Sequence, residues 1–378
     1  MEKKKILIYI PSFTIGGTMA SLSSLLSAID PRRVQIDVYC RSHLGPCKSN
    51  LTNCNVLKER IFLSSVIRSR GFFMKCLSSA FQFLLRIAKI CKFNLERYTY
   101  ALGGRLIKAN DYDAIIAYQE SIARYVQYIK STNKIAWVHC DYERLINERP
   151  EIIHQVNFEI YDKIVCVSKS AKASFLRVFP GLSSKVLHIY NIVDSVKVRD
   201  EEKSSPNCNA DFVKEGKTIV SVGRFDEVKQ FDKIPFIASK IKELTNVPFK
   251  WYIIGAGNNK DYEDVVQAKI KKFSVDDNVI IYPAQKHVYP YMMADVLVST
   301  SKSETFSLVV FEARALGVLP VMNDIPIAYE IIRDAETGFI SSLDKMPMIL
   351  TNILENNIKL DFDDWDNSES IASFYNLY

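Results

Sequence analysis

Short apolar segments alternate with stretches of helical periodicity along almost the whole chain. They form a first series at residues 4–10, 34–40, 114–118, 135–139 and 163–167, and a second series at residues 217–222, 249–254, 278–282, 294–299 and 318–323. Strands separated by helices predict an α/β fold, in which a parallel sheet carries helices on both faces. Because 378 residues exceed what one core usually accommodates, the two series predict two doubly wound domains that face each other across a cleft.

A polar stretch without hydrophobic periodicity separates the two series. Residues 200–216 contain a cluster of Glu, Ser and Asn around Pro206, which is typical of a linker. We therefore expect an N-terminal domain over residues 1–199 and a C-terminal domain over residues 217–366. Ligands of such sheets bind beyond the carboxyl ends of the strands. The residues that follow predicted strands are Gly16, His139, Arg224, Gly255 and Glu304.

The segment 301–321, SKSETFSLVVFEARALGVLPV, is the most informative part of the second series. Residues 294–300 predict a buried strand, residues 301–305 the loop that leaves it, and residues 307–316 a helix. The start of this helix would face the end of the strand. That arrangement suits an anionic ligand, because the N-terminus of a helix carries unpaired N–H groups and a partial positive charge.

Each polar group of this segment has an expected partner in a sugar nucleotide. Backbone N–H groups of Ser307, Leu308 and Val309 would bind a diphosphate. Glu312 lies just past the first helical turn, and helical side chains lean toward the N-terminus, so its carboxylate would reach ribose hydroxyls. Glu304, on the loop, would meet the sugar instead.

This segment resembles the E-x7-E element of retaining GT-B glycosyltransferases, the class (family 4) that includes glycogen synthases and many bacterial polysaccharide enzymes. Other segments resemble the family in the same order along the chain: a glycine loop at Gly16 and Gly17, a His-bearing strand end at 137–141, the last strands of the first domain at 166–170 and 189–194, an Arg and Lys turn at 221–229, a strand with a glycine turn at 253–257, and the approach to the E-x7-E strand at 289–298. Residues 367–378 resemble the terminal helix that crosses back to the first domain. The resemblance implies a GT-B fold with two Rossmann-like domains, the first binding the acceptor and the second the nucleotide sugar.

The chain departs from the family pattern at three places. Thr305, Phe306 and Ser307 stand where the family most often has Gly-Phe-Gly, so the loop must approach its ligand without glycine freedom. Gln230 stands where a Gly commonly follows the Lys. Thr18 and Met19 follow the glycine loop, where a charged residue is often seen. These departures bear on the identity of the donor more than on activity.

The resemblance also implies roles for individual residues. Arg224 and Lys229 would stabilise the charge that develops on the departing diphosphate, without a metal or another cofactor. His139 would donate a hydrogen bond to the donor sugar near the reacting carbon. Gly255 would let the backbone approach the donor. Glu304 would orient the sugar during front-face attack or act as a covalent nucleophile, and the sequence leaves both mechanisms open.

Other enzyme classes fit the sequence less well. A metal-dependent transferase needs an Asp-x-Asp after a strand, whereas Asp111 and Asp113 precede one and are interpreted as a solvated turn. The spaced glycines of a dinucleotide-binding fingerprint do not follow Gly17. A nucleotide-sugar epimerase of similar fold and a noncatalytic glycosyltransferase-like partner protein remain the alternatives.

The charge of the chain is uneven. Between Lys58 and Lys108 there are eleven Lys or Arg against two Glu, a balance of +9 that exceeds the +6 of the whole chain. Apolar residues recur there at helical spacing, which predicts a basic amphipathic helix. We interpret it as a contact with an anionic membrane surface, and a helix packed on its own domain is the alternative. The residues expected to touch the membrane are Lys75, Arg86, Lys89 and Lys92. A nucleic-acid partner is not expected, because no recognition motif accompanies the basic residues.

Cysteine spacing and the first residues bear on the compartment. The eight cysteines form no C-x-x-C pair or metal-binding pattern, and the first predicted strand begins close to Met1, so we expect a reduced, cytoplasmic protein peripheral to the inner face of the plasma membrane. The resemblance implies transfer of a hexose from a nucleotide sugar to a hydroxyl of a lipid-linked oligosaccharide, as in the synthesis of a bacterial capsule, O-antigen or similar polymer. A UDP-sugar is the favoured donor and a GDP-sugar the alternative.

Overall fold

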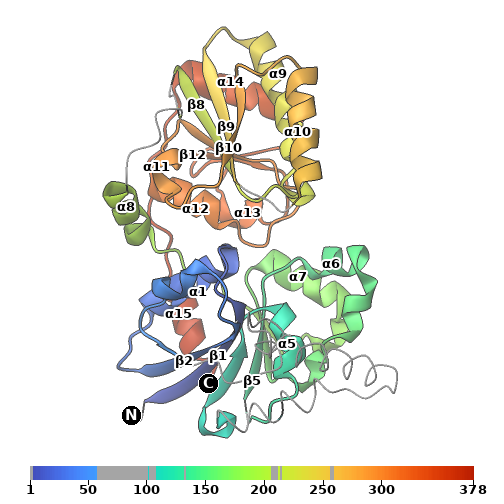
Figure 1. The fold of residues 1–378 in the computed structure, drawn as a ribbon, viewed down its shortest axis with the longest axis vertical. Coiled ribbons are helices and arrows are strands. Elements are labelled where there is room, and N and C mark those ends of the chain that lie inside the picture. Colours follow the sequence, from blue (N-terminus) through green and yellow to red (C-terminus); the bar gives the residue numbers. More distant parts are fainter. Residues whose placement is uncertain are drawn as a thin grey trace, which may run out of the picture. The chain divides into compact units, whose positions relative to one another are not determined.

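The computed structural model describes residues 3–57, 101, 108–131, 133–205, 212, 215–255 and 259–378. Its contacts divide the chain into two compact units (Figure 1). Unit 1 comprises Met1–Ile192 and Asn367–Tyr378, and unit 2 comprises Val193–Asp366. The segment that carries the predicted membrane contacts, with Lys75, Arg86, Lys89 and Lys92, lies outside the described residues.

Unit 1 is built on a seven-stranded sheet in the order β3-β2-β1-β4-β5-β6-β7, and all its strand pairs are parallel. The strands are β1 (Lys4–Ser12), β2 (Val34–Ser42), β3 (Asn55–Val56), β4 (Ala114–Ala117), β5 (Lys134–Val138), β6 (Lys163–Cys166) and β7 (Val186–His188). The described α-helices of this unit are α1 (Gly17–Ala28), α5 (Glu120–Val126), α6 (Tyr142–Glu148), α7 (Lys169–Val178) and α15 (Ser368–Tyr375). The strand order changes direction between β1 and β4, so loops after these two strands diverge at the carboxyl edge of the sheet.

Unit 2 repeats this plan with a six-stranded parallel sheet in the order β10-β9-β8-β11-β12-β13. The strands are β8 (Lys217–Val222), β9 (Phe249–Gly255), β10 (Val279–Pro283), β11 (Val296–Ser299), β12 (Leu319–Asn323) and β13 (Phe339–Ser341). The described α-helices are α8 (Ser195–Ser204), α9 (Ile234–Leu244), α10 (Lys260–Lys272), α11 (Tyr289–Met292), α12 (Leu308–Ala315), α13 (Ala328–Ile331) and α14 (Met346–Asn356). Here the strand order changes direction between β8 and β11.

Continuous apolar runs form the central strands, because helices cover both faces of a parallel sheet. Residues 6–10 of β1 are all buried. In unit 2 a buried polar chain fixes the three central strands: Trp251 of β9 donates its indole N–H to Ser221 Oγ of β8 at 3.1 Å, and Ser221 donates to the carbonyl oxygen of Val298 of β11 at 2.7 Å. The central strands therefore give the loops at their carboxyl ends a rigid base.

Helix α15 belongs to unit 1 although it follows all of unit 2 in the sequence. The backbone N–H of Asp30 donates to the Tyr375 hydroxyl at 2.9 Å, and Lys163 Nζ donates to the carbonyl oxygen of Leu377 at 2.9 Å. Phe374 is fully buried, with its ring centroid 6.3 Å from that of Trp137. Unit 1 is therefore assembled from two segments of the chain.

Two expectations for the end of the first series are wrong. The linker predicted over residues 200–216 begins inside α8, whose N-terminus is capped where Asp194 Oδ1 accepts from the N–H of Lys197 at 3.0 Å. The strand expected within residues 189–194 is β7 at Val186–His188 instead, and the boundary between the units follows Ile192 rather than residue 199. A charged helix such as α8 has too few apolar residues for its period to show in the sequence.

Within the part of the chain that the structure describes, none of the helices has both the length and the hydropathy to cross a membrane.

Candidate functional site

A lysine and a glutamate meet at the point where the strand order of unit 2 changes direction. Lys229 follows β8, Glu304 follows β11, and Lys229 Nζ lies 2.5 Å from Glu304 Oε1. The Ser301 hydroxyl donates to the same carboxylate oxygen at 2.8 Å. The Lys229 side chain is 22% exposed and the Glu304 side chain 14% exposed, so most of this ion pair is shielded from bulk water. Ligands of open α/β sheets bind at such a switch point.

The backbone fixes the two loops relative to each other. Lys302 donates its backbone N–H to the carbonyl oxygen of Val228 at 2.9 Å, and the Thr300 hydroxyl donates to the carbonyl oxygen of Lys229 at 2.7 Å. Asn323, at the end of β12, donates its side-chain amide to the carbonyl oxygen of Ser301 at 3.0 Å. The ammonium and carboxylate groups are thus held by the ends of three neighbouring strands.

Close backbone approach explains the glycine at the end of β9. A Cβ atom on Gly255 would lie 1.8 Å from the carbonyl oxygen of Gly223, so a side chain at this position would force the β8 and β9 loops apart. A Cβ on Gly223 would in turn lie 3.1 Å from Lys229 Cε. The two glycines therefore keep these loops and the Lys229 side chain close together.

Helix α12 begins directly beyond the Glu304 loop. Ser307 is its N-cap residue, in the left-handed conformation with φ 60° and ψ 63°, and the helix starts at Leu308. The N–H groups of Leu308 and Val309 have no acceptor within the helix, because the first residues of an α-helix lack the preceding carbonyl groups. Below this turn, the Phe306 and Phe311 rings stack with centroids 4.7 Å apart. Aromatic packing thus holds the turn in place.

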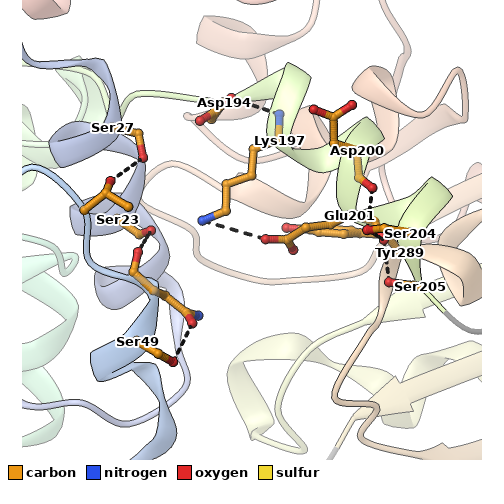
Figure 2. A network of polar contacts seen from close by, with 12 residues as sticks. Ser23, Ser27, Ser49, Asp194, Lys197, Asp200, Glu201, Ser204, Ser205 and Tyr289 are labelled. Atoms are coloured by element: carbon orange, nitrogen blue, oxygen red, sulfur yellow. Dashed lines mark hydrogen bonds and ion pairs between the residues drawn. The ribbon is translucent and has the colours of Figure 1, made fainter.

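Glu312 lies one turn into α12 in a largely buried position. Burial raises the pKa of its carboxyl to about 7, and the neighbouring Glu201 carboxylate adds to the rise, while a hydrogen bond from Tyr289 opposes it. The Tyr289 hydroxyl, on α11, donates to Glu312 Oε1 over a long 3.5 Å. Figure 2 shows Glu201 of α8 beside Tyr289, with Lys197 Nζ 3.8 Å from Glu201 Oε1. Glu312 therefore sits where an uncompensated charge is costly and a ligand hydroxyl would stabilise it.

The structure does not bring Arg224 to the Lys229 and Glu304 pair. Its side chain is 77% exposed, and its guanidinium lies 3.6 Å from Asp226 in the same turn. An exposed arginine of this kind retains many rotamers. The sequence places Arg224 in the loop after β8 but does not determine where its side chain points.

In unit 1 the predicted residues lie after neighbouring strands. His139 follows β5, and its backbone N–H donates to Glu120 Oε2 at 3.1 Å. Burial lowers the pKa of the His139 imidazole to about 3, so the ring is neutral at physiological pH. Gly16 and Gly17, after β1, have open space where a Cβ would stand. A ligand could therefore approach the start of α1 closely.

Sequence reasoning missed a buried polar chain at this edge of unit 1. The Ser21 hydroxyl of α1 donates to Asn191 Oδ1 at 2.6 Å and lies 2.9 Å from the Tyr118 hydroxyl. Burial also raises the pKa of the Glu120 carboxyl. The signal available in the sequence was the polar segment that follows an apolar strand: Tyr118 comes directly after β4, and Glu120 begins α5 two residues later.

Asp113 has a structural role instead of a metal-binding one. Its carboxylate accepts from Lys4 Nζ at 2.7 Å and from the backbone N–H of Lys5 at 2.9 Å, at the start of β1. Among the described residues, no group of three His, Cys, Asp or Glu side chains is placed to hold a metal ion.

Comparisons with known proteins agree with this architecture. Residues 209–347 match the family model described as Glycosyl transferases group 1. HepE from Anabaena, solved in complex with UDP and glucose, superimposes with a TM-score of 0.67 and 15% identity over 98% of this chain and 93% of that chain. The apo form of the lipopolysaccharide outer core galactosyltransferase WaaB superimposes with a TM-score of 0.62 and 16% identity over 99% of this chain and 95% of that chain. The chain has the GT-B fold.

Two proteins of related sequence agree with the family match. An uncharacterized glycosyltransferase of Methanocaldococcus jannaschii is 28% identical over 341 residues, which are 87% of this chain and 82% of that protein. An uncharacterized 41.2 kDa protein in the cps region of Klebsiella pneumoniae is 24% identical over 274 residues, which are 70% of this chain and 69% of that protein. With the family match, these similarities support a GT-B glycosyltransferase. Within the GT-B fold, residues 209–347 contain Lys229, Glu304 and α12.

Proposed function

We propose that this protein is a retaining, metal-independent hexosyltransferase that moves a sugar from a nucleotide donor to a hydroxyl acceptor. The observation that carries the proposal is the Lys229 and Glu304 pair at the switch point of unit 2, next to the N-terminus of α12. The cation and the unpaired N–H groups fit the diphosphate of a nucleotide sugar, and the carboxylate fits its sugar.

The charges of the site residues determine which part of the nucleotide sugar each residue is proposed to bind. The diphosphate binds the N–H groups of Leu308 and Val309 and the ammonium of Lys229, which neutralise the negative charge that grows as the glycosidic bond breaks. Glu312 accepts hydrogen bonds from the ribose hydroxyls. Glu304 holds Lys229 in place and orients the sugar, either during front-face attack or as a nucleophile.

Arg224 and His139 have more limited proposed roles. Arg224 swings from Asp226 to the diphosphate when the donor binds, because an exposed guanidinium reorients at little cost. His139 acts as a neutral hydrogen-bonding group toward the donor sugar, since a ring with a pKa near 3 carries no charge at neutral pH. Gly16 and Gly17 allow close approach of the substrates, and Gly255 keeps the loops after β8 and β9 together around the donor site.

The donor, acceptor and location complete the proposal. A UDP-sugar is favoured, which the UDP complex of the similar HepE supports, and a GDP-sugar is the alternative. The acceptor is a lipid-linked oligosaccharide of a bacterial surface polysaccharide, in keeping with the relative in a cps region and the similarity to WaaB. The enzyme would work at the inner face of the plasma membrane, held there by Lys75, Arg86, Lys89 and Lys92.

A nucleotide-binding screen tests the donor site. Thermal unfolding is measured with UDP, GDP, ADP and the corresponding sugar nucleotides, with and without EDTA, because a ligand of the native state stabilises it by mass action. We expect one base to stabilise the protein, independently of EDTA, and the effect to be lost in Glu304→Gln and Lys229→Met. The matched control is Glu355→Gln on the exposed side of α14, which should keep the full response. A folded protein that responds to no nucleotide would favour the noncatalytic alternative.

Two further measurements test the remaining parts. The anomeric configuration of the product, followed by NMR, distinguishes retention from inversion. Neutralising Lys75, Arg86, Lys89 and Lys92 together should abolish binding to anionic liposomes and leave nucleotide affinity unchanged. Liposome binding that persists in this variant would exclude the proposed membrane contact.

A further inference from the structure

Ser307 combines two unfavourable features at one position. Its backbone is left-handed, with φ 60°, a conformation that residues other than glycine seldom adopt. The residue is only 7% exposed, and its hydroxyl is buried with no hydrogen-bond partner among the described residues. Buried polar groups are nearly always hydrogen-bonded, so an exception calls for a physical explanation.

Local secondary structure does not provide that explanation. A serine at the N-cap normally accepts a hydrogen bond from an N–H in the first helical turn. Ser307 makes no such bond, because the side chain of an N-cap residue reaches those N–H groups from an extended backbone and not from a left-handed one. The hydroxyl and the N–H groups of Leu308 and Val309 thus remain available at the same helix end.

Glycine would avoid both features, since it adopts a left-handed backbone without strain and has no hydroxyl to bury. The hydroxyl at this position is therefore better explained by the binding of a ligand than by stabilisation of the fold. The position lies three residues from Glu304 along the chain, at the N-terminus of α12, where the diphosphate is proposed to bind.

We propose that the Ser307 hydroxyl donates a hydrogen bond to a phosphate oxygen of the nucleoside diphosphate and adds to the recognition of the leaving group. This inference rests on the proposed function and goes beyond it, because the backbone N–H groups alone would suffice for a generic anion. The hydroxyl adds a donor at the helix end that a diphosphate can use and a nucleoside cannot.

Two substitutions separate the hydroxyl from the backbone. Ser307→Gly removes both the hydroxyl and the left-handed strain, so its Tm should equal or exceed that of the wild type. Ser307→Ala removes the hydroxyl and keeps the strained backbone. Both should weaken UDP binding about tenfold, the lower end of the effect of a hydrogen bond to a charged group, and leave uridine binding unchanged.

Ser274 provides a matched control in the same unit. It is exposed and also left-handed, with φ 51°, but it follows α10 at the edge of the sheet where the strands begin. Ser274→Gly should raise or keep the Tm and leave UDP affinity unaltered. This comparison shows whether relief of left-handed strain by itself changes binding.

The measurements are isothermal titration calorimetry with UDP and uridine and thermal unfolding of all four proteins. UDP affinity within twofold of the wild type in both Ser307 variants would overturn the inference, as would an equal loss for uridine, which would indicate a distorted loop. If the wild type binds UDP in these cases, the proposed function stands and only the role of Ser307 is refuted. A wild type that binds no nucleotide would refute both.

Discussion

Replacing Glu312 with glutamine should change how the stability of unit 2 depends on pH. The pKa of this carboxyl is raised from 4.5 to about 7 by burial. In the folded protein the group keeps its proton between these pH values, whereas in the unfolded chain it releases it. The stability that protonated Glu312 contributes is therefore fully present below about pH 4.5 and is lost as the pH rises through 7.

The size of the effect follows from the pKa. One pH unit corresponds to ~1.4 kcal/mol, so a carboxyl that titrates near 7 instead of 4.5 loses about 3 kcal/mol of unfolding free energy over the interval. For a unit of this size that is roughly 6–12 °C in Tm. Glu312→Gln keeps the shape and carries no charge. We expect its stability to match that of the wild type near pH 4.5 and to exceed it at pH 8.

Urea unfolding from pH 4.5 to 8.5, without nucleotide, measures the difference between the two proteins. Every other titrating group contributes equally to both curves, and Glu355→Gln, on an exposed helical surface, should run parallel to the wild type. A difference between Glu312→Gln and the wild type that stays constant over the whole range would refute the argument that burial raises this pKa. The affinity of Glu312→Gln for UDP should fall, which would show that the Glu312 carboxylate lowers stability but is needed to bind the nucleotide.

Three more outcomes are expected. Gly255→Ala should cost roughly 2–3 kcal/mol in thermal unfolding, because its Cβ would lie 1.8 Å from a carbonyl oxygen, whereas Gly181→Ala, with open space around it, should be nearly neutral; equal effects would contradict the steric argument. Lys229→Met should destabilise unit 2 by about 2 kcal/mol in urea unfolding, since it leaves the largely buried Glu304 carboxylate with one hydrogen bond. Adding Glu304→Leu should recover most of this loss, and simple additivity of the two effects would show that the pair is not coupled. Deleting α15 should make unit 1 sensitive to limited proteolysis and leave unit 2 resistant; cleavage of unit 2 first would contradict the assignment of this helix.

The sequence predicts the central strands well because they are buried on both faces. β8 was predicted with its observed bounds, Lys217–Val222, and the neighbouring strands differ by a few residues. The shortest strands were not predicted at their observed places: β3, with two residues, and β13, with three, were missed, and β7, with three, was expected a few residues later. The longer edge strand β10 was predicted to within one residue. Helix α8 was missed because its sequence, SVKVRDEEKS, has almost no apolar face. Asp194, its N-cap, was the one signal present.

The site could be predicted as a set of loops but not as a set of contacts. Order along the chain places Lys229 and Glu304 after neighbouring strands, yet only the structure shows that they form an ion pair. The same reasoning placed Arg224 beside them, and its exposed side chain is paired with Asp226. Side-chain direction depends on rotamers and on packing between distant segments, which spacing in a sequence does not encode.

Because α15 comes at the end of the sequence, the two units are completed at different times during translation. Unit 2 is one continuous segment and has all its residues as soon as Asp366 has left the exit tunnel. Unit 1 starts first, but the side chain that fills its core beside Trp137, Phe374, emerges after unit 2 is complete. The first half of this protein is therefore the last to be finished, and until then its nascent sheet carries an exposed apolar surface that a chaperone could cover.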